Sequence, residues 1–298
     1  MARECQYGGQ AVIEGVMMRG PEELAIAVRK ANNEIVLEEK PINSVTKKFP
    51  FLKWPFLRGT VMLFESLIIG VRALTFSANQ AADGEEEELS NWELALTIAV
   101  AMGLGILLFV VTPASIARLL YVIKSPVLVT FLEGLVRISI FLVYVLIISR
   151  MKDIQRVFQY HGAEHKVIHA YEAGEELTVA NAQKYSTLHP RCGTSFLLIV
   201  MVIMIFLFSF IGKPPLLIRI AAKIILLPVV AGISYEIIKL SGKYARTPVM
   251  KIIIAPGLWL QKLTTREPDD GQVEVAIRAL AAVLPDDEKE DFRAAGCL

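Results

Sequence analysis

Four long apolar segments constrain the fold of this chain more than any other feature of its sequence. They occupy residues 92–112, 126–149, 194–211 and 216–240. Each is close to the ~20 apolar residues that a helix needs to cross a hydrocarbon core about 30 Å thick. With 54% hydrophobic and 20% charged residues, the chain is also more apolar than soluble domains usually are. The sequence therefore predicts a mainly α-helical membrane protein built on a four-span bundle.

The positions of lysine and arginine orient this predicted bundle. Ten of these residues precede residue 92, six lie in the loop 150–193, and nine follow residue 238. The two remaining connections between spans hold only three. Because loops on the cytoplasmic side carry an excess of lysine and arginine, we expect both termini and the loop 150–193 to be cytoplasmic. No basic stripe with interleaved aromatic residues is present, so nucleic acid is not an expected partner.

Residues 1–50 are predicted to form a small cytoplasmic β element. Strand-like runs at residues 11–18 and 25–30 are separated by a turn-prone Arg-Gly-Pro sequence, and a third run follows at residues 34–42. The last two runs are joined through Asn32-Asn33, a plausible hairpin turn because asparagine tolerates positive φ. These residues therefore predict a compact antiparallel sheet ahead of the membrane segments.

Residues 51–91 are predicted to contain an amphipathic helix at residues 57–79 and an acidic linker with four glutamates at residues 85–88. A charged residue recurs at every seventh position of this helix, at Arg58, Glu65 and Arg72. Such a polar stripe fits a helix that lies in the membrane interface or one that packs against a bundle, and we favour the interface. After the spans, residues 241–298 form an apolar interfacial patch at 252–260 and a cytoplasmic tail with a short helix at 274–284.

The four histidines of the chain all lie between His161 and His189. The spacing of His161, His165 and His169 places their side chains on one face of a helix. His189 and Cys192 follow, immediately before the third predicted span, where a turn would bring them next to that helix. Since the three cysteines are few and far apart, a disulfide framework is not expected, and a reducing cytoplasm fits them better.

Two histidines one helical turn apart can bind a single transition metal ion. The order His161-x-x-Glu164-His165 matches the H-x-x-E-H arrangement, in which the histidines bind zinc and the glutamate handles the proton of a bound water. The further ligand is predicted to be His189, Cys192 or Glu236, and we expect the ion to be a divalent metal, zinc in particular. Glu164 would be the general base, and His169 would transfer protons or support a ligand. A solvated histidine face beside a capped span is the non-functional alternative.

Several other charged residues have two interpretations. Glu133 and Arg137 stand four residues apart inside the second predicted span, where charges are costly and often functional. We favour a structural ion pair between them. Glu236 fits a metal ligand and an interfacial ion pair equally well. In the glycine-rich first block, a system of tight turns is favoured over a role for Glu14 and Arg19 as substrate contacts.

Four blocks of the sequence carry a resemblance to a known family. They are GGQAVIEGVMMRGP, FLRGTVMLFESLIIGVRAL, YHGAEHKVIHAYE and HPRCGTSF. Together they resemble the YqhQ family of bacterial membrane proteins, from residue 7 to about residue 280. The resemblance implies a multi-pass protein of the bacterial inner membrane. Members of this family have been described as predicted metal-dependent enzymes, but no established reaction or ligand set comes with the resemblance.

The leading hypothesis from the sequence is a membrane-embedded, metal-dependent hydrolase with a cytoplasm-facing site. Its substrate would be a lipid headgroup or a membrane peptide. The competing hypothesis is a non-enzymatic scaffold or assembly factor, in which a metal serves only as a structural clip. A closed site with four protein ligands would favour the clip, whereas an open coordination position would favour catalysis. Transport is a weaker third hypothesis, since no internal repeat is visible.

Overall fold

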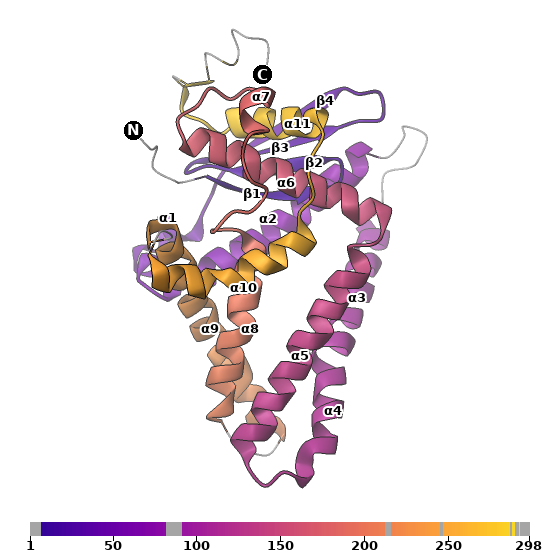
Figure 1. Cartoon of the computed structure of the whole chain (residues 1–298), viewed down its shortest axis with the longest axis vertical. Coiled ribbons are helices and arrows are strands. Elements are labelled where there is room, and N and C mark those ends of the chain that lie inside the picture. Colours follow the sequence, from indigo (N-terminus) through magenta and orange to yellow (C-terminus); the bar gives the residue numbers. More distant parts are fainter. Residues whose placement is uncertain are drawn as a thin grey trace.

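The computed structural model describes residues 7–81, 91–211, 216–244, 247–286, 288–289 and 292. The predicted acidic linker at residues 85–88, Cys5 and Cys297 lie outside these described residues. Figure 1 shows a head, formed by a small sheet and the helices around it. The helices at residues 91–119, 126–148, 193–209 and 216–244 extend from the head along the long axis and are called the steep helices below. The protein is thus mainly helical with a small N-terminal antiparallel sheet, as the sequence predicts.

The sheet is a four-stranded meander whose strands pair in sequence order. Its strands are β1 (Gly8–Val12), β2 (Gly15–Arg19), β3 (Glu23–Arg29) and β4 (Ile35–Pro41). The hairpin turn predicted at Asn32-Asn33 is confirmed, and Asn33 has a φ of 66°. The single strand predicted at residues 11–18 is wrong, because the chain reverses there between β1 and β2. Glu14 lies in this turn with a φ of 49°. The sequence does not indicate the turn, because the residues on both sides of it favour strands.

Three segments that are far apart in the sequence build the core of the head. One face of the sheet packs against α6 (Lys152–Glu172), from the loop between spans, and against α11 (Asp270–Ala281), from the tail. The core is formed by apolar residues of all three, among them Val16, Met18, Tyr160, Val167, Val273 and Leu280. The predicted N-terminal element, central loop and tail therefore form one folded unit, and α6 is fixed firmly within it.

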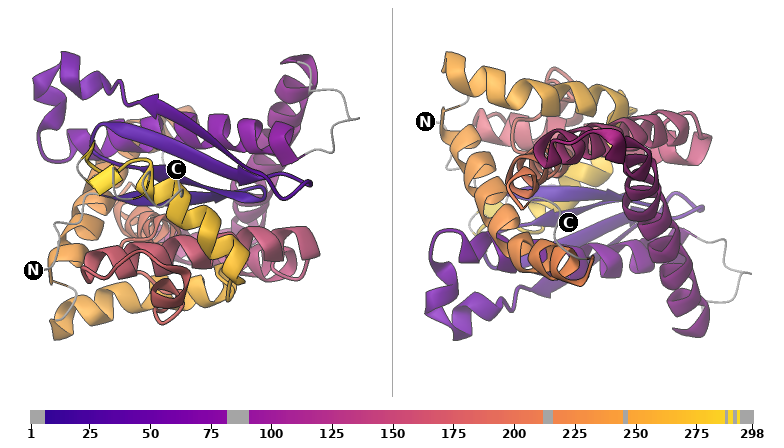
Figure 2. Two further views of the ribbon diagram at one scale, coloured as in Figure 1. Left: turned by 90° about the horizontal axis from the view of Figure 1, so that it is seen from above. Right: turned by 90° about the horizontal axis from the view of Figure 1, so that it is seen from below.

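The opposite face of the sheet is covered by α2 (Leu57–Ala81). Because side chains alternate along a strand, Met17 points to this face and packs with Ala73 of α2, while its neighbours Val16 and Met18 point to the other core. Figures 1 and 2 show α2 running across the long axis of the molecule, beneath the sheet. This helix is itself long and apolar enough to cross a membrane, and its place in the membrane interface stays a prediction.

A second helix, α10 (Pro248–Thr264), also crosses the long axis (Figure 1). It contains the apolar patch predicted at residues 252–260. Its exposed face carries large apolar side chains, Ile252 and Trp259 among them, whereas Leu260 and Gln261 are buried against the rest of the protein. The helix therefore has one face suited to an apolar environment and another that reaches the interior. Shorter helices complete the head: α1 (Val45–Lys48), η1 (Pro50–Lys53) and α7 (Val179–Ala182).

Three helices within the described residues are long and apolar enough to cross a membrane: Leu57–Ala81, Ala95–Ile116 and Pro126–Ile148. The first of these is α2 and the third is α5. The second runs from α3 (Asn91–Ile106) through the π-helical turn η2 (Leu107–Val111) into α4 (Thr112–Leu119), which η3 (Leu120–Val122) follows. The second and third coincide with the first two predicted spans, whereas the first coincides with the helix predicted at residues 57–79. The other two predicted spans fall on α8 (Gly193–Ser209), a shorter apolar helix, and on α9 (Leu216–Tyr244). These helices indicate a membrane protein, and the number of four spans stays a prediction.

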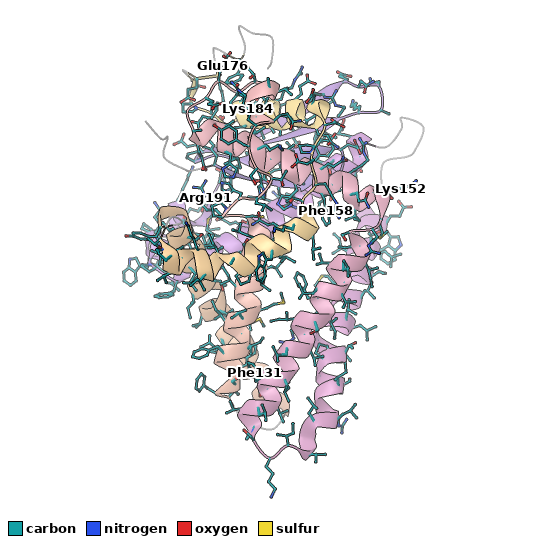
Figure 3. All side chains as sticks on the ribbon, viewed as in Figure 1. Phe131, Lys152, Phe158, Glu176, Lys184 and Arg191 are labelled. Carbon is teal, nitrogen blue, oxygen red and sulfur yellow. The ribbon has the colours of Figure 1, made fainter. Side chains whose placement is uncertain are left out.

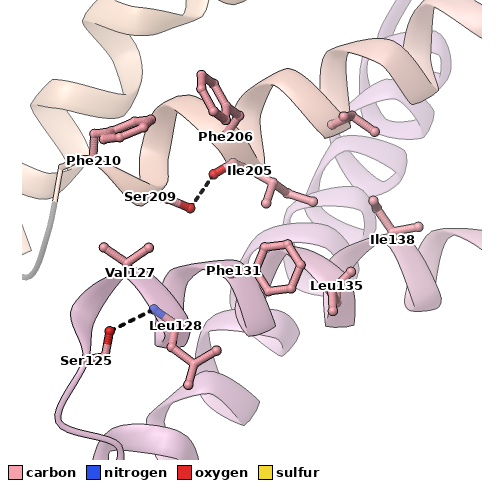
Figure 4. Close-up of a pocket in the computed structure, with 11 residues that line it drawn as sticks. Ser125, Val127, Leu128, Phe131, Leu135, Ile138, Ile205, Phe206, Ser209 and Phe210 are labelled. Atoms are coloured by element: carbon pink, nitrogen blue, oxygen red, sulfur yellow. Dashed lines mark hydrogen bonds between the residues drawn. The ribbon is translucent and has the colours of Figure 1, made fainter. Parts of the chain in front are cut away.

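A cavity of about 600 Å³ opens between α5 and α8. Its lining is almost wholly apolar, with Phe131, Leu135 and Phe206 among the residues drawn in Figure 4. Figure 3 places Phe131 on the steep helices, far from Arg191, which lies where those helices meet the head. This cavity is therefore separate from the histidine cluster described below.

The predicted ion pair inside the second span is present. Arg137 Nη2 lies 3.1 Å from Glu133 Oε1, and the Glu133 side chain is 4% exposed. Arg137 Nε also donates to the carbonyl oxygen of Phe109, at 3.1 Å, in the π-helical turn η2. The irregular turn thus offers a carbonyl oxygen to a guanidinium whose side chain is 15% exposed.

We expect Gly162→Ala to destabilise the head by about 1–3 kcal/mol, the usual cost of adding volume to a tightly packed interior. A Cβ at Gly162 would lie only 2.1 Å from the carbonyl oxygen of Arg266. Gly8→Ala is the matched control, because a Cβ at Gly8 meets no atom within 4 Å. Thermal unfolding of the detergent-solubilised variants measures the difference. Equal midpoints for the two variants would contradict the close packing of α6 against residues 264–267.

Candidate metal centre

The histidines lie on the face of α6 that points away from the core of the head. Ala163 and Val167 on the opposite face are fully buried against the sheet and α11. This amphipathic pattern fixes the rotation of the helix, so that His161, His165 and His169 face the segment that leads into α8 and the end of α10. The predicted helical face of three histidines is therefore present.

Backbone carbonyl groups fix the tautomers of these three rings. His161 Nδ1 lies 2.8 Å from Thr264 O, and His165 Nδ1 lies 2.6 Å from Thr187 O. Because a carbonyl oxygen only accepts hydrogen bonds, each of these nitrogens is the donor, and in the neutral rings Nε2 keeps its lone pair. Histidines that bind metals are commonly oriented in this way. The rings of His161 and His165 are thus arranged for ligation through Nε2.

Cys192 completes the first group of potential ligands. It is the N-cap residue of α8, where its sulfur accepts from Thr194 N at 3.4 Å. Its Sγ lies 3.1 Å from His161 Nε2, and the ring centroids of His161 and His165 are 4.4 Å apart. One ligand atom from each of the three residues lies within 4.8 Å of the others. Two imidazole nitrogens and one sulfur form a donor set typical of zinc.

The electrostatics of this group favour a cation. Burial by itself raises the pKa of the Cys192 thiol, but the neighbouring rings of His161 and His165 outweigh it and hold that pKa well below its usual value. Burial likewise lowers the pKa of His161, but the nearby Cys192 sulfur outweighs it and raises the pKa to about 9. Both shifts favour a negative sulfur beside a positive ring, and a metal cation bound by the two residues would likewise balance the charge of that sulfur.

Glu164, which lies between His161 and His165 in the sequence, is also buried, with an exposed fraction of 5%. Its Oε1 accepts a hydrogen bond of 2.9 Å from Gly9 N in β1. Burial raises the pKa of its carboxyl group, although His165 and His161 oppose the shift. A Cβ at Gly9 would approach Glu164 Cγ to 3.0 Å, so the first glycine block leaves room for this carboxyl. A glutamate with a raised pKa beside potential ligands fits acid–base chemistry.

His189 belongs to a second group, with His169 and Glu172, whose potential ligand atoms also lie within 4.8 Å of one another. Its backbone is held by Gln261 of α10, which accepts from His189 N and donates to His189 O, both at 2.8 Å. Burial lowers the pKa of His189 to about 4, so the ring is neutral at physiological pH. His189 therefore does not join Cys192 in the first group, although the two residues are close in the sequence.

The structure does not bring Glu236 to the histidines. Its carboxylate is bound by the guanidinium of Arg58 on α2, with Nε at 2.7 Å and Nη2 at 2.5 Å. Glu236 therefore forms an ion pair with Arg58 of α2, whereas the sequence suggested Lys239 or Lys243, the lysines that follow it. Glu14 and Arg19 are likewise in ion pairs, with Arg156 and Glu65.

Sequence reasoning missed several residues that shape this site. Glu172 is visible in the sequence, because it follows His169 by three residues at helical spacing, but the sequence assigned it no role. Gln261, Thr264 and Gly9 have no comparable signal, since they reach the cluster from the tail and from β1. Figure 3 shows where the cluster lies: Phe158 and Arg191, which are close to its members in the sequence, lie where the head meets the steep helices.

These observations define a class: a helical protein with helices apolar enough to cross a membrane and a buried histidine–cysteine–glutamate cluster beneath a small sheet. The family model described as "Protein of unknown function (DUF1385)" matches residues 54–286, which include every candidate ligand. The "Uncharacterized protein YqhQ" of Bacillus subtilis (strain 168) is 38% identical over 292 residues, covering 93% of this chain and 92% of that protein. The chain therefore belongs to the YqhQ family. No solved structure matches it.

Proposed function

We propose that this protein is a metal-dependent hydrolase whose active site lies where the head meets the steep helices. The observation that carries the proposal is the convergence of His161, His165 and Cys192, with ligand atoms within 4.8 Å of one another. Three protein ligands leave one tetrahedral position for a water molecule, as in catalytic zinc sites. A divalent metal bound there, with zinc favoured by the donor set, would supply a nucleophilic water at neutral pH.

The protein residues have distinct roles in this proposal. The carbonyl groups of Thr264 and Thr187 hold the rings of His161 and His165 in the tautomer that binds metals. Glu164 takes a proton from the nucleophile, and Gly9 N–H keeps its carboxyl in position. α10 reaches the site through Thr264 at its end, and its exposed apolar face supports a membrane substrate, either a lipid headgroup or a membrane peptide.

Metal analysis of the purified protein tests the site. We expect the native protein to contain at least one more equivalent of bound metal than the variant His161→Ala/His165→Ala. Glu236→Gln is the matched control and should keep its metal, because that carboxylate binds Arg58. Equal, near-zero metal in the native protein and the double variant would remove the proposal, and metal loss in Glu236→Gln would refute the ligand assignment.

A structural metal clip is the second candidate function, and the burial of the site favours it. His165 is 1% exposed and Cys192 6% exposed. The first group also joins α6 of the head to the start of α8, so a metal there would tie the head to the steep helices. A clip predicts that chelation lowers the unfolding temperature, while the metal-loaded protein does not hydrolyse bis(p-nitrophenyl) phosphate, p-nitrophenyl acetate or fluorogenic phospholipids. Metal-dependent turnover of any of these probes would instead support the hydrolase.

A further inference from the structure

A buried nitrogen without a partner marks a second site beside the first. His189 is 4% exposed, and its Nε2 has no hydrogen-bond partner among the described residues. An unsatisfied polar atom in the protein interior is costly, and a bound ion can satisfy it. The nearest acidic group is Glu172, whose Oε2 lies 3.7 Å from His189 Nε2, too far for a hydrogen bond.

The groups around this nitrogen form a set of metal ligands. The ring of His169 lies with its centroid 4.6 Å from that of His189, and His169, Glu172 and His189 each offer a ligand atom within 4.8 Å of the others. His169 Nε2 donates to Leu188 O at 3.0 Å, which leaves Nδ1 as the ligand atom of the neutral ring. Glu172 binds Arg191 through Oε1, so Oε2 is the oxygen that faces the histidines.

We propose that His169, Glu172 and His189 bind a second divalent metal ion, so that the cluster is a two-metal centre. The two groups adjoin, since the rings of His165 and His189 are 5.5 Å apart between centroids. His189 Nδ1 accepts a long hydrogen bond of 3.4 Å from Arg191 N, so the ring hydrogen sits on Nε2 before binding. Ligation through Nε2 moves this hydrogen to Nδ1 and breaks the contact with Arg191 N–H.

The second ion deepens the proposed function and rests on it, because it assigns a class of substrate to the same site. The second group contains one carboxylate, and Arg191 already neutralises it. Two divalent ions would therefore leave the buried cluster with excess positive charge, even with the Cys192 thiolate counted. An anionic substrate would balance that charge, and paired metal ions are a frequent arrangement in enzymes that hydrolyse phosphate esters.

Titration of the metal-free, detergent-solubilised protein with Co²⁺ tests the second site. We expect the native protein to bind two Co²⁺ per chain, and only one of them to give thiolate-to-cobalt charge-transfer absorption. Glu172→Gln should bind one Co²⁺ with that absorption intact, and Cys192→Ser should lose the absorption but keep the ion of the second site. Tyr185→Phe is the control and should bind two, because its hydroxyl donates to Glu175 and its ring only stacks on His169.

The outcomes separate the two proposals. One Co²⁺ in the native protein, with the absorption present and unchanged in Glu172→Gln, would overturn the second site and leave the first. One Co²⁺ that depends on Glu172, without thiolate absorption, would overturn the first site and support the second. His169→Gln is the additional variant if Glu172→Gln does not fold, and it should likewise lose one Co²⁺.

Discussion

Glu164→Gln is expected to reduce metal-dependent hydrolysis about 10²- to 10⁴-fold, the usual contribution of a positioned general base. The glutamine amide keeps an oxygen that can accept the 2.9 Å hydrogen bond from Gly9 N, so the shape of the site is preserved. It cannot take up a proton, whereas the carboxyl group can, and burial raises the pKa of that carboxyl above its usual value. The rate with bis(p-nitrophenyl) phosphate and the metal content of the same preparation are the measurements.

The metal content makes this prediction specific. Glu164→Gln should bind as much metal as the native protein, because Glu164 is in neither group of converging ligands. A variant that keeps the native rate would exclude Glu164 as the base. One that loses both metal and activity would make Glu164 a ligand instead. Glu236→Gln, with its carboxylate away from the cluster, should change neither quantity.

The local part of the site could be predicted from the sequence. Three histidines at intervals of four residues share a face on any helix, and the apolar residues between them show which face is buried. Long apolar segments have an equally local cause, and two predicted spans coincide with helices long enough to cross a membrane. The position of Cys192 at the start of α8 also follows from its place just before an apolar segment.

The contacts between distant segments could not be predicted. Glu236 fits a ligand in the sequence alone, because the sequence does not reveal that α9 packs against α2, where Arg58 binds it. That packing depends on close contact at small residues, since a Cβ at Gly59 would lie 2.6 Å from Tyr235 Cβ. The separation of His189 from Cys192 has a similar origin, because Gln261 of α10 holds the His189 backbone. Only the folded tail supplies this constraint.

Arg137→Met is expected to cost about 3–5 kcal/mol of stability, because it removes the cation from a buried ion pair and leaves its partner charge uncompensated. Glu133 is 3% exposed and lies on α5, away from the head. The methionine side chain has a similar length but cannot bind this carboxylate or the carbonyl oxygen of Phe109. Denaturation of the detergent-solubilised protein, followed by its helical circular dichroism, measures the loss.

The double variant Glu133→Gln/Arg137→Met shows whether the cost arises from the lone charge. With the carboxylate replaced by a neutral amide, the double variant should be more stable than Arg137→Met alone, since two neutral groups are far cheaper to bury than one unpaired ion. Glu133→Gln alone is the third variant, and a double variant whose loss equals the sum of the two single losses would mean that the residues act independently and that the 3.1 Å pair contributes nothing. Metal binding should be unchanged in all three variants, because this pair lies on α5 while the candidate ligands lie on α6 and the segment leading to α8. The Glu133–Arg137 ion pair would then stabilise the helical bundle without affecting the metal-binding residues of the head.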